Sequence, residues 1–152
     1  MEHQRNNTLE TSYRPAQLGE WFDIYKIFMR TAEKNPLFSQ CSLVNIAKNL
    51  RLFIRLGLVL VVYRADQKIG YVGAGVTQGW WMSRPLLTEL FVLGLRPGFG
   101  YVAHNLLISL AKQNNCSMIQ AGNALSIDKQ LTTNGYLKDG FSKYDEFYKE
   151  IS

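Results

Sequence analysis

Residues 94–107 read GLRPGFGYVAHNLL, and this stretch joins an apolar run to a helical pattern. The run before it, LLTELFVL at 86–93, has the length and composition of a buried strand. Behind it, apolar residues recur every three or four positions over 101–114, which predicts a helix. Three glycines and a proline within 94–100 therefore lie where a strand gives way to a helix. Such a loop is either a plain turn or a cradle for phosphate, because glycines let main-chain amides approach an anion closely.

The patterns on either side of this unit predict an α/β protein. A strand, a helix and a second strand at 117–122 demand a right-handed crossover with the two strands parallel. Strands at 58–63 and 68–77 are separated by a short turn and predict an antiparallel hairpin. The other predicted elements are a strand at 12–16, helices from Gln17 to before Asn35-Pro36, at 42–55 and at 126–133, and closing strands at 136–139 and 144–151. Together they predict a mixed, mostly antiparallel sheet with a central parallel strand–helix–strand unit and helices on both faces.

Length and composition predict one folded domain over residues 1–152, with a polar, loosely held start over about residues 1–12. Apolar residues make up 47% of the chain and charged residues 19%, which is enough apolar surface for a core. The net charge is +5, but Lys and Arg are scattered, with no run of four. A nucleic-acid groove is therefore not favoured.

Hydropathy argues against a membrane partner. The first residues, MEHQRNN, lack the apolar segment of a signal peptide. The most apolar stretch, LRLFIRLGLVLVVYR, is interrupted by Arg51, Arg55 and Gly57 and is too short to span a bilayer. We therefore expect a cytoplasmic protein.

The few cysteines and histidines predict no metal site. Cys41 and Cys116 are far apart in the sequence and match neither metal-ligand nor redox spacing. His3 and His104 each stand alone. Zinc binding, which needs several such ligands close together, is not expected.

On these residues the chain resembles the GNAT superfamily, the N-acetyltransferases that use acetyl-CoA. The family's central pattern is an apolar strand ending in an L-Y-V-like triplet, a loop R-G-x-G-x-G or Q-x-x-G-x-G/A, and a helix opening toward L-L. The matching residues here are Leu90-Phe91-Val92, Arg96-Pro97-Gly98-Phe99-Gly100 and Leu106-Leu107. The loop departs from the family pattern, because Pro97 stands in place of the arginine and Val102 in place of the last glycine. The closing stretch DEFYKEI resembles that of some phage-encoded members.

The second half of the chain fits the family in two alternative registers. In the first, Asn123 closes the preceding strand and LTTNGY at 131–136 matches Y-E-K-N-G-F, which puts the family's acid tyrosine at Leu131. In the second, the residues from Tyr136 to Phe141 match Y-E-K-L-G-F and restore the tyrosine. We prefer the first register, because it keeps the family's short helix between the asparagine and the glycine.

The resemblance implies acetyl-CoA as the co-substrate and a place where it binds. Main-chain amides at the start of a helix are unsatisfied and carry partial positive charge, which suits a pyrophosphate. Pantetheine would pair with the strand before the loop like an added strand, and the amide of Asn123 would contact it. Asn123 is alternatively a helix N-cap or a turn residue. The implied cofactor-binding residues are Phe91, Val92, Leu93, Arg96, Pro97, Gly98, Phe99, Gly100, Tyr101, Val102 and Asn123.

Acetyl transfer to an amine needs a base, a donor for the tetrahedral oxyanion and an acid for the leaving thiolate. Glu89 is the only carboxylate in LLTELFVL and is the candidate base, with a pKa that burial would raise. A surface glutamate on a half-exposed strand is the alternative. The main-chain amide of Val92 or Leu93 would polarise the thioester carbonyl. Tyr136 is the candidate acid, and otherwise a core residue.

Two further features precede this strand. Trp80 and Trp81 either line an acceptor pocket or seal an edge or interface. The glycines at 70, 73 and 75 predict a bulge or a close approach of two backbones.

The leading hypothesis is an N-acetyltransferase that acts on a primary amine of a small molecule or a protein. The resemblance also implies a homodimer, which is frequent in the family. The alternative is a catalytically degenerate GNAT-fold protein that serves as a structural virion component or binds a host protein. The atypical loop and Leu131 favour that alternative.

Overall fold

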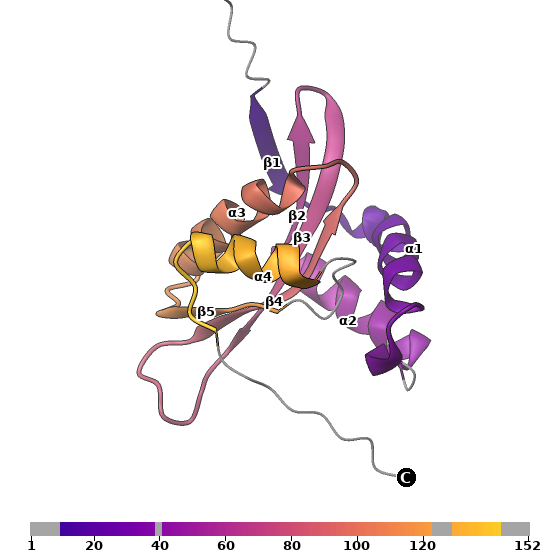
Figure 1. The fold of residues 1–152 in the computed structure, drawn as a ribbon. Coiled ribbons are helices and arrows are strands. Elements are labelled where there is room, and N and C mark those ends of the chain that lie inside the picture. Colours follow the sequence, from indigo (N-terminus) through magenta and orange to yellow (C-terminus); the bar gives the residue numbers. More distant parts are fainter. Residues whose placement is uncertain (1–9, 39–40, 123–128, 144–152) are drawn as a thin grey trace, which may run out of the picture.

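The computed structural model of the chain describes residues 10–38, 41–122 and 129–143 (Figure 1). In chain order the elements are β1 (Thr11–Pro15), η1 (Leu18–Glu20), α1 (Trp21–Ala32), η2 (Pro36–Phe38), α2 (Leu43–Arg55), β2 (Val59–Arg64), β3 (Gln67–Thr77), β4 (Leu86–Gly94), α3 (Phe99–Gln113), β5 (Met118–Gln120) and α4 (Lys129–Lys138). This order agrees with the sequence prediction as far as β5. The predicted strand at 144–151, the start of the predicted helix at 126–133 and residues 1–9 lie outside the described residues.

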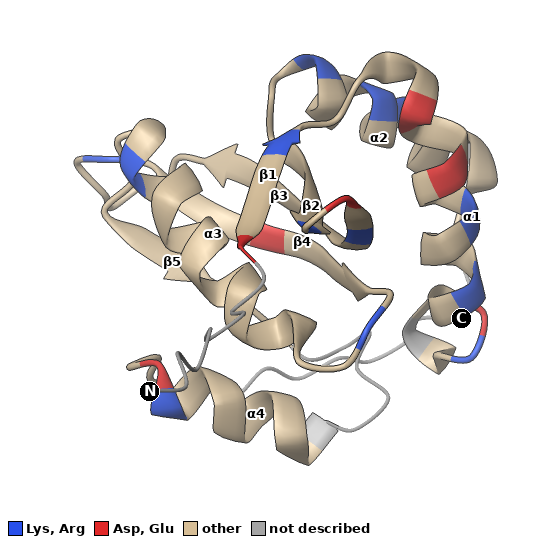
Figure 2. Cartoon of the chain, turned by 90° about the horizontal axis from the view of Figure 1, so that it is seen from above, with Lys and Arg blue, Asp and Glu red and all other residues tan. Residues whose placement is uncertain are grey.

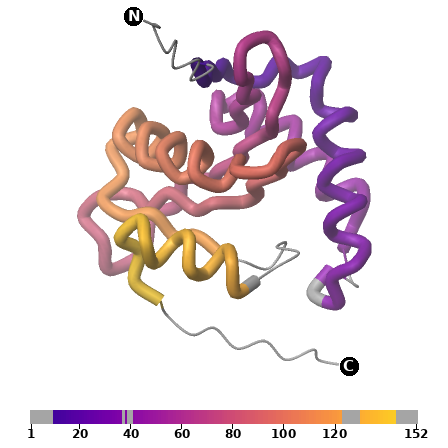
Figure 3. The backbone as a smooth tube through the Cα atoms, turned by 45° about the horizontal axis from the view of Figure 1, so that its top comes forward, coloured from indigo at the N-terminus to yellow at the C-terminus, as the bar shows by residue number. Residues whose placement is uncertain are grey.

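The strands form a sheet in the order β1-β2-β3-β4-β5. Neighbours from β1 to β4 are antiparallel, whereas β4 and β5 are parallel and are connected by α3. The predicted hairpin and the predicted strand–helix–strand unit are therefore both present. Figures 1 and 3 show α1 and α2 on one face of the sheet and α3 and α4 on the other. The predicted mixed α/β fold class is confirmed.

Each face of the sheet has its own core. Under α1 and α2 lie Ala16, Ile24, Leu50, Ile54, Val59, Val61, Tyr71, Phe91 and Leu93. Under α3 lie Leu60, Val62, Ile69, Val72, Ala74, Leu87, Phe99, Ala103, Leu106, Leu107, Leu110 and Ala111. Burying each Leu, Ile or Val contributes about 1.5–3 kcal/mol, so both helical layers are held mainly by apolar contact with the sheet.

An extra residue in β4 divides its side chains between the two faces. Gly73 of β3 pairs with Phe91, but the next residue, Ala74, pairs with Glu89, so Leu90 has no partner across the ladder. This bulge turns both Leu90 and Phe91 toward the core under α1 and α2. Glu89 faces the other way, where its carboxylate contacts α4.

Glycines in β3 allow this arrangement. A Cβ at Gly73 would lie 2.2 Å from the Phe91 ring, so only glycine leaves room for that ring. A Cβ at Gly70 would lie 2.5 Å from the ring of Phe99, the first residue of α3. The predicted bulge lies beside Gly73, and a close backbone approach occurs at Gly70, where a Cβ would lie 2.6 Å from the Leu93 carbonyl oxygen, whereas at Gly75 the nearest atom would be at an ordinary 3.7 Å.

The pairing of β4 with β5 is short. It covers Leu86, Leu87 and Thr88, opposite Met118, Ile119 and Gln120. Beyond Thr88, β4 continues to Gly94 with no strand on that edge within the residues that the structure describes. An unpaired strand edge presents free N–H and C=O groups, so this part of β4 can accept an added strand.

Two helix boundaries differ from the sequence prediction. Helix α3 begins at Phe99, not at 101, so Phe99 and Gly100 belong to its first turn. Helix α4 ends at Lys138, not at 133, and the predicted strand at 136–139 is helix and turn. The sequence Asn134-Gly135, which we interpreted as a helix stop, lies inside α4.

The actual stop of α4 lies at Gly140, whose φ is +89°. Its N–H donates to the Leu137 carbonyl at 3.2 Å, and the N–H of Phe141 donates to the Tyr136 carbonyl at 3.0 Å. The rings of Tyr136 and Phe141 lie 4.9 Å apart. These two bonds with an apolar contact across them form a Schellman motif, which needs a left-handed residue that glycine supplies best.

We predict opposite effects of alanine at the two glycines of α4. Gly135→Ala raises the free energy of unfolding by about 0.5–1 kcal/mol, because glycine is a poor helix-interior residue and the new Cβ would meet the His104 ring at an ordinary 3.5 Å. Gly140→Ala lowers it by about 1–2 kcal/mol, because a side chain is strained at positive φ. Urea denaturation of the two variants measures both changes. Equal effects would contradict this end of α4.

Candidate active site

The start of α3 is fixed by packing of its first residue. Gly98 has φ +81° and turns the chain into the helix. The Phe99 side chain is buried in the core under α3, against the backbone of Gly70 and Gly94. The loop before it is held to β3, because the Leu95 N–H donates to the Ile69 carbonyl at 2.9 Å. The helix start is therefore a defined surface at the carboxyl end of β4.

The first amides of α3 are available to a ligand. No acceptor in the described parts of the chain takes up the N–H groups of Phe99, Gly100 or Tyr101. A Cβ at Gly98 or Gly100 would meet no atom within 4 Å, so the approach to these amides is open. Unsatisfied amides with the positive end of the helix dipole favour an anion. The residues present therefore fit a pyrophosphate.

Cationic side chains lie near this helix start. Arg96 and Pro97 are exposed and line a shallow depression together with Arg64, Gln67 and Ile69. Tyr101 is exposed, and Lys138 from α4 lies over its ring with Nζ 5.9 Å from the centroid. Val102 is half-buried against the core under α3. Of the predicted loop residues, Phe99 and Val102 pack in the core under α3, and the others are exposed to solvent.

The predicted pantetheine strand is the open edge of β4. Phe91 and Leu93 point their side chains into the core under α1 and α2, and Val92 packs against the core under α3. Their side chains are thus committed to packing, and their main chain faces β3 on one edge only. Asn123, predicted to contact the same ligand, lies outside the described residues.

Glu89 lies at the point where β4 and β5 stop pairing. It is the only acidic residue in the described strands. Its Oε2 accepts hydrogen bonds from the Gly122 N–H at 2.9 Å and from the Tyr136 hydroxyl at 3.0 Å. Burial raises the pKa of this carboxyl above its ordinary value, although both hydrogen bonds act to lower it.

The two oxygens of the Glu89 carboxylate differ in their hydrogen bonds to the described residues. Both bonds from Gly122 and Tyr136 fall on Oε2, and no described residue donates to Oε1.

Tyr136 brings the second candidate catalytic residue to Glu89. The two residues are 47 positions apart in sequence, and α4 places the buried Tyr136 against β4. Burial and the neighbouring Glu89 carboxylate raise the pKa of Tyr136. Leu131, where our preferred register put the tyrosine, is 69% exposed on α4. The end of α4 at Gly140 agrees with the alternative register, which matches Tyr136 to the family tyrosine.

Sequence reasoning missed two residues beside Tyr136. His104 does not stand alone: its ring stacks on the Tyr136 ring with centroids 4.3 Å apart, and its Nδ1 contacts the Asp139 carboxylate. His104 lies among Ala103, Leu106 and Leu107 on the buried side of α3. A polar residue on an apolar helix face needs a partner, and this was the available signal.

The tryptophan pair lies away from Glu89. Trp80 and Trp81 are 92% and 71% exposed, in the loop before β4, and their rings pack edge to face with centroids 5.5 Å apart. The loop is closed by the Met82 N–H, which donates to the Gly79 carbonyl at 3.0 Å. It adjoins the end of β4 that is paired with β5, opposite to the start of α3.

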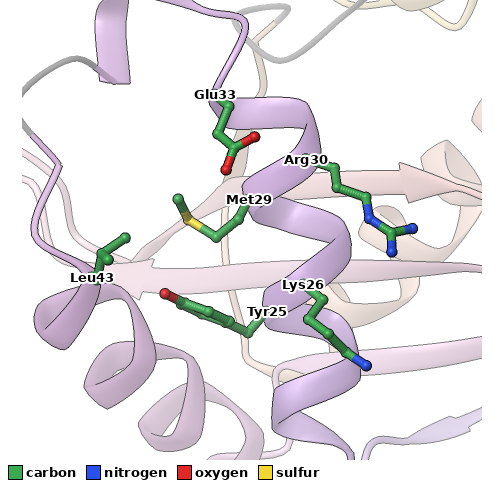
Figure 4. A pocket seen from close by; sticks show the side chains of 6 residues that line it. All are labelled: Tyr25, Lys26, Met29, Arg30, Glu33 and Leu43. Carbon is green, nitrogen blue, oxygen red and sulfur yellow. The ribbon is translucent and has the colours of Figure 1, made fainter.

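A separate depression lies between α1 and α2. It is lined by Tyr25, Lys26, Met29, Arg30, Glu33 and Leu43. Figure 4 shows Tyr25 and Met29 extending from α1 toward Leu43 at the start of α2. It lies on the opposite face of the sheet from Glu89, and no predicted site residue lines it.

Other partner classes find no support in the described residues. Figure 2 shows Lys and Arg spread over several elements, not gathered in one stripe. Within residues 10–38, 41–122 and 129–143, no three His, Cys, Asp or Glu side chains are grouped as metal ligands. None of the described helices has the length and apolar character that crossing a bilayer requires.

We predict that Glu89 makes the protein less stable as the pH rises. Its pKa is raised in the folded state, so the stability it contributes is fully present below its ordinary value of 4.5 and is lost as pH rises through the folded value. Glu89→Gln, which keeps an acceptor for both hydrogen bonds, removes this loss. The unfolding free energies of wild type and Glu89→Gln, measured from pH 4 to pH 8, should thus converge at low pH. At high pH the variant should be the more stable of the two. Glu33→Gln, at an exposed acid of α1, is the control, and equal pH curves for wild type and Glu89→Gln would contradict the prediction.

Comparison with known proteins places this geometry in a known fold. No model of a known protein family and no curated protein matches the sequence. Among solved structures, a predicted acetyltransferase from Clostridium acetobutylicum with acetyl-CoA is similar at TM-score 0.69 and 15% identity, over 93% of this chain and 96% of that one. A GCN5-related N-acetyltransferase from Ralstonia eutropha is similar at TM-score 0.66 and 13% identity, over 93% and 99%.

A third structure, AAC(6')-Iy in complex with the bisubstrate analog CoA-S-monomethyl-acetylneamine, is similar at TM-score 0.67 and 9% identity, over 94% of this chain and 99% of that one. None of the three is named as a phage protein, so a phage-encoded origin gains no support. The similarity covers nearly the whole chain in each case. The chain therefore has the fold of the GNAT superfamily, the GCN5-related N-acetyltransferases.

Proposed function

We propose that this protein is an N-acetyltransferase that moves an acetyl group from acetyl-CoA to a primary amine. The observation that carries the proposal is the hydrogen bond between Glu89 and Tyr136, at the edge of β4 that no described strand pairs with beyond Thr88. This pair of proton-transfer groups lies on the strand that ends at the open amides of α3. Acetyl-CoA that binds those amides and extends along β4 would place its acetyl group at Glu89.

The donor site we propose uses main chain more than side chains. The amides of Phe99, Gly100 and Tyr101 would bind the pyrophosphate, with Arg96 as a cationic neighbour. The edge of β4 from Phe91 to Leu93 would bind pantetheine as an added strand. Similar structures contain acetyl-CoA or a CoA bisubstrate analog, which supports this choice of donor.

Acetyl transfer by Glu89 and Tyr136 needs no reactant besides acetyl-CoA and the amine. A neutral amine attacks the thioester carbonyl carbon, and the Glu89 carboxylate takes the amine proton. The tetrahedral intermediate collapses, the carbon–sulfur bond breaks, and Tyr136 gives its proton to the thiolate of CoA. Because Tyr136 and Glu89 share a hydrogen bond, the proton held by Glu89 can then return to Tyr136. The raised pKa of Glu89 brings the base closer to neutral pH, where proton transfer is most effective.

Tyr136 bears on the catalytically degenerate alternative, which drew support from Leu131 in the place of the acid tyrosine. Leu131 is exposed, and Tyr136 lies within hydrogen-bond distance of Glu89. We therefore propose Tyr136 as the acid and the main chain at Gly98 and Gly100, where added side chains would meet no atom within 4 Å, as the anion site.

We predict that acetyl-CoA raises the melting temperature of the protein, because a ligand that binds only the folded state adds stability. At 100 times the dissociation constant the added stability is about 2.7 kcal/mol. Gly100→Glu should abolish the shift, since it puts a negative charge at the open amides, whereas Gly100→Ala should retain most of it. Both side chains would enter open space, so both variants fold. Differential scanning fluorimetry with millimolar acetyl-CoA measures the shifts, and a full shift in Gly100→Glu would remove this loop from the donor site.

We also predict that the two proton-transfer residues act mainly on turnover. Glu89→Gln and Tyr136→Phe each lower kcat by about 100- to 10,000-fold, as expected for loss of a general base or acid. The KM for acetyl-CoA changes little, because neither side chain lies at the proposed pyrophosphate site. A CoA-release assay over a panel of primary amines supplies the rates. Binding of acetyl-CoA without transfer to any amine would support the degenerate alternative instead.

A further inference from the structure

We propose that His104 and Asp139 are positioning residues that hold Tyr136 against Glu89, an inference that rests on the proposed acetyl transfer. Neither residue touches the proposed donor or acceptor. Both contact the element that carries Tyr136: His104 stacks on its ring from α3, and Asp139 joins the end of α4 to His104. The pair would therefore act on the reaction only through the placement of the tyrosine hydroxyl.

The last turn of α4 is joined to α3 at Tyr136 and at Asp139. Among the described side chains of α4, Tyr136 is the only buried one. Lys138 lies over the Tyr101 ring at the surface, and the Phe141 ring lies just past the helix, 4.9 Å from Tyr136. The contact from His104 to Asp139 adds a polar point of attachment one turn from the tyrosine.

The position of Asp139 is unfavourable for the helix itself. The residue follows the last turn of α4, where helix carbonyls and the helix dipole disfavour negative charge. His104 is the group that compensates it, because its Nδ1 contacts the Asp139 carboxylate. An acid at this end of a helix is thus explained by its contact with α3, not by helix formation.

The position of His104 is equally unfavourable for the core. It is 6% exposed, with Ala103, Leu106 and Leu107 beside it on α3. An apolar residue of similar size would pack there at no cost in desolvation. What the imidazole adds is a flat face for the Tyr136 ring, tilted 21° from it, and a polar edge for Asp139. Both features bear on the same side chain, Tyr136.

The proposed reaction depends on where the Tyr136 hydroxyl lies. The Tyr136 hydroxyl donates to Glu89 at 3.0 Å, and it must reach the leaving sulfur during the reaction. Misplacement of a catalytic group by about 1 Å can lower the rate by about 100-fold. Loss of the His104–Asp139 contact should therefore slow turnover and leave donor binding intact.

Single variants measure the effect first. His104→Phe keeps a stacked ring and loses the contact with Asp139, and Asp139→Ala loses the same contact from the other side. Each is expected to lower kcat by up to about 100-fold with an unchanged KM for acetyl-CoA. Asp139→Asn keeps an acceptor for His104 and should lose less than Asp139→Ala. Asn105→Ala, on the exposed side of α3, is the control and should retain wild-type kinetics.

A double-mutant cycle separates positioning from general support of the fold. In a Tyr136→Phe background the hydroxyl is already absent, so His104→Phe and Asp139→Ala should cause no further loss of kcat. Additive losses, or a parallel loss of acetyl-CoA binding, would overturn the proposal and show that the pair serves general stability.

An NMR measurement, which needs no turnover, tests the inference independently of the proposed function. NMR of the protein with ring-labelled tyrosine identifies Tyr136 as the signal missing in Tyr136→Phe. In Asp139→Ala this signal should broaden or split, because the ring samples more than one position. A single unchanged signal overturns the positioning role. Failure of the wild-type protein to acetylate any amine, with this NMR result as expected, overturns the proposed function alone.

Discussion

The extra residue in β4 is the constraint on which the rest of the site depends. A strand alternates its side chains between two faces, so without a bulge Glu89 and Phe91 would point to the same face. With Leu90 inserted, Phe91 fills the core under α1 and α2, and Glu89 faces α3 and α4. One added residue thereby lets a single short strand serve as core on one face and as a polar site on the other.

The same strand sets the distance between the two ends of the site. From Glu89 the main chain of β4 runs to Gly94, and the chain then turns at Gly98 into α3. Helix α3 returns along the strand, so its first turn offers amides at one end and His104 supports Tyr136 nearer the other. Because Phe99 is packed against Gly70 and Gly94, the helix cannot slide relative to the strand. Binding and proton transfer would then occur on one rigid unit.

Local sequence patterns predicted the parts of this structure that local physics determines. The strand–loop–helix order, the parallel unit, the hairpin and the first two helices follow from apolar spacing and turn residues, and the structure has them. Glu89 was identifiable because it is the only acid in an apolar strand. The end of α4 was not, since Asn134-Gly135 is a good local stop signal that burial of Tyr136 overrides. The contact of His104 with Asp139 spans 35 positions, which no local pattern encodes.

The state of Glu89 without substrate shows how the site would be prepared for an amine. A buried carboxylate is costly unless it is hydrogen-bonded, and here a main-chain amide and a phenol both satisfy the same oxygen. That division leaves Oε1 without a donor among the described residues, so an amine that reaches Oε1 would displace neither Gly122 nor Tyr136. The two donors keep the carboxyl from becoming too basic, while burial keeps it from becoming too acidic. The opposing effects on one side chain are those that a base working near neutral pH requires.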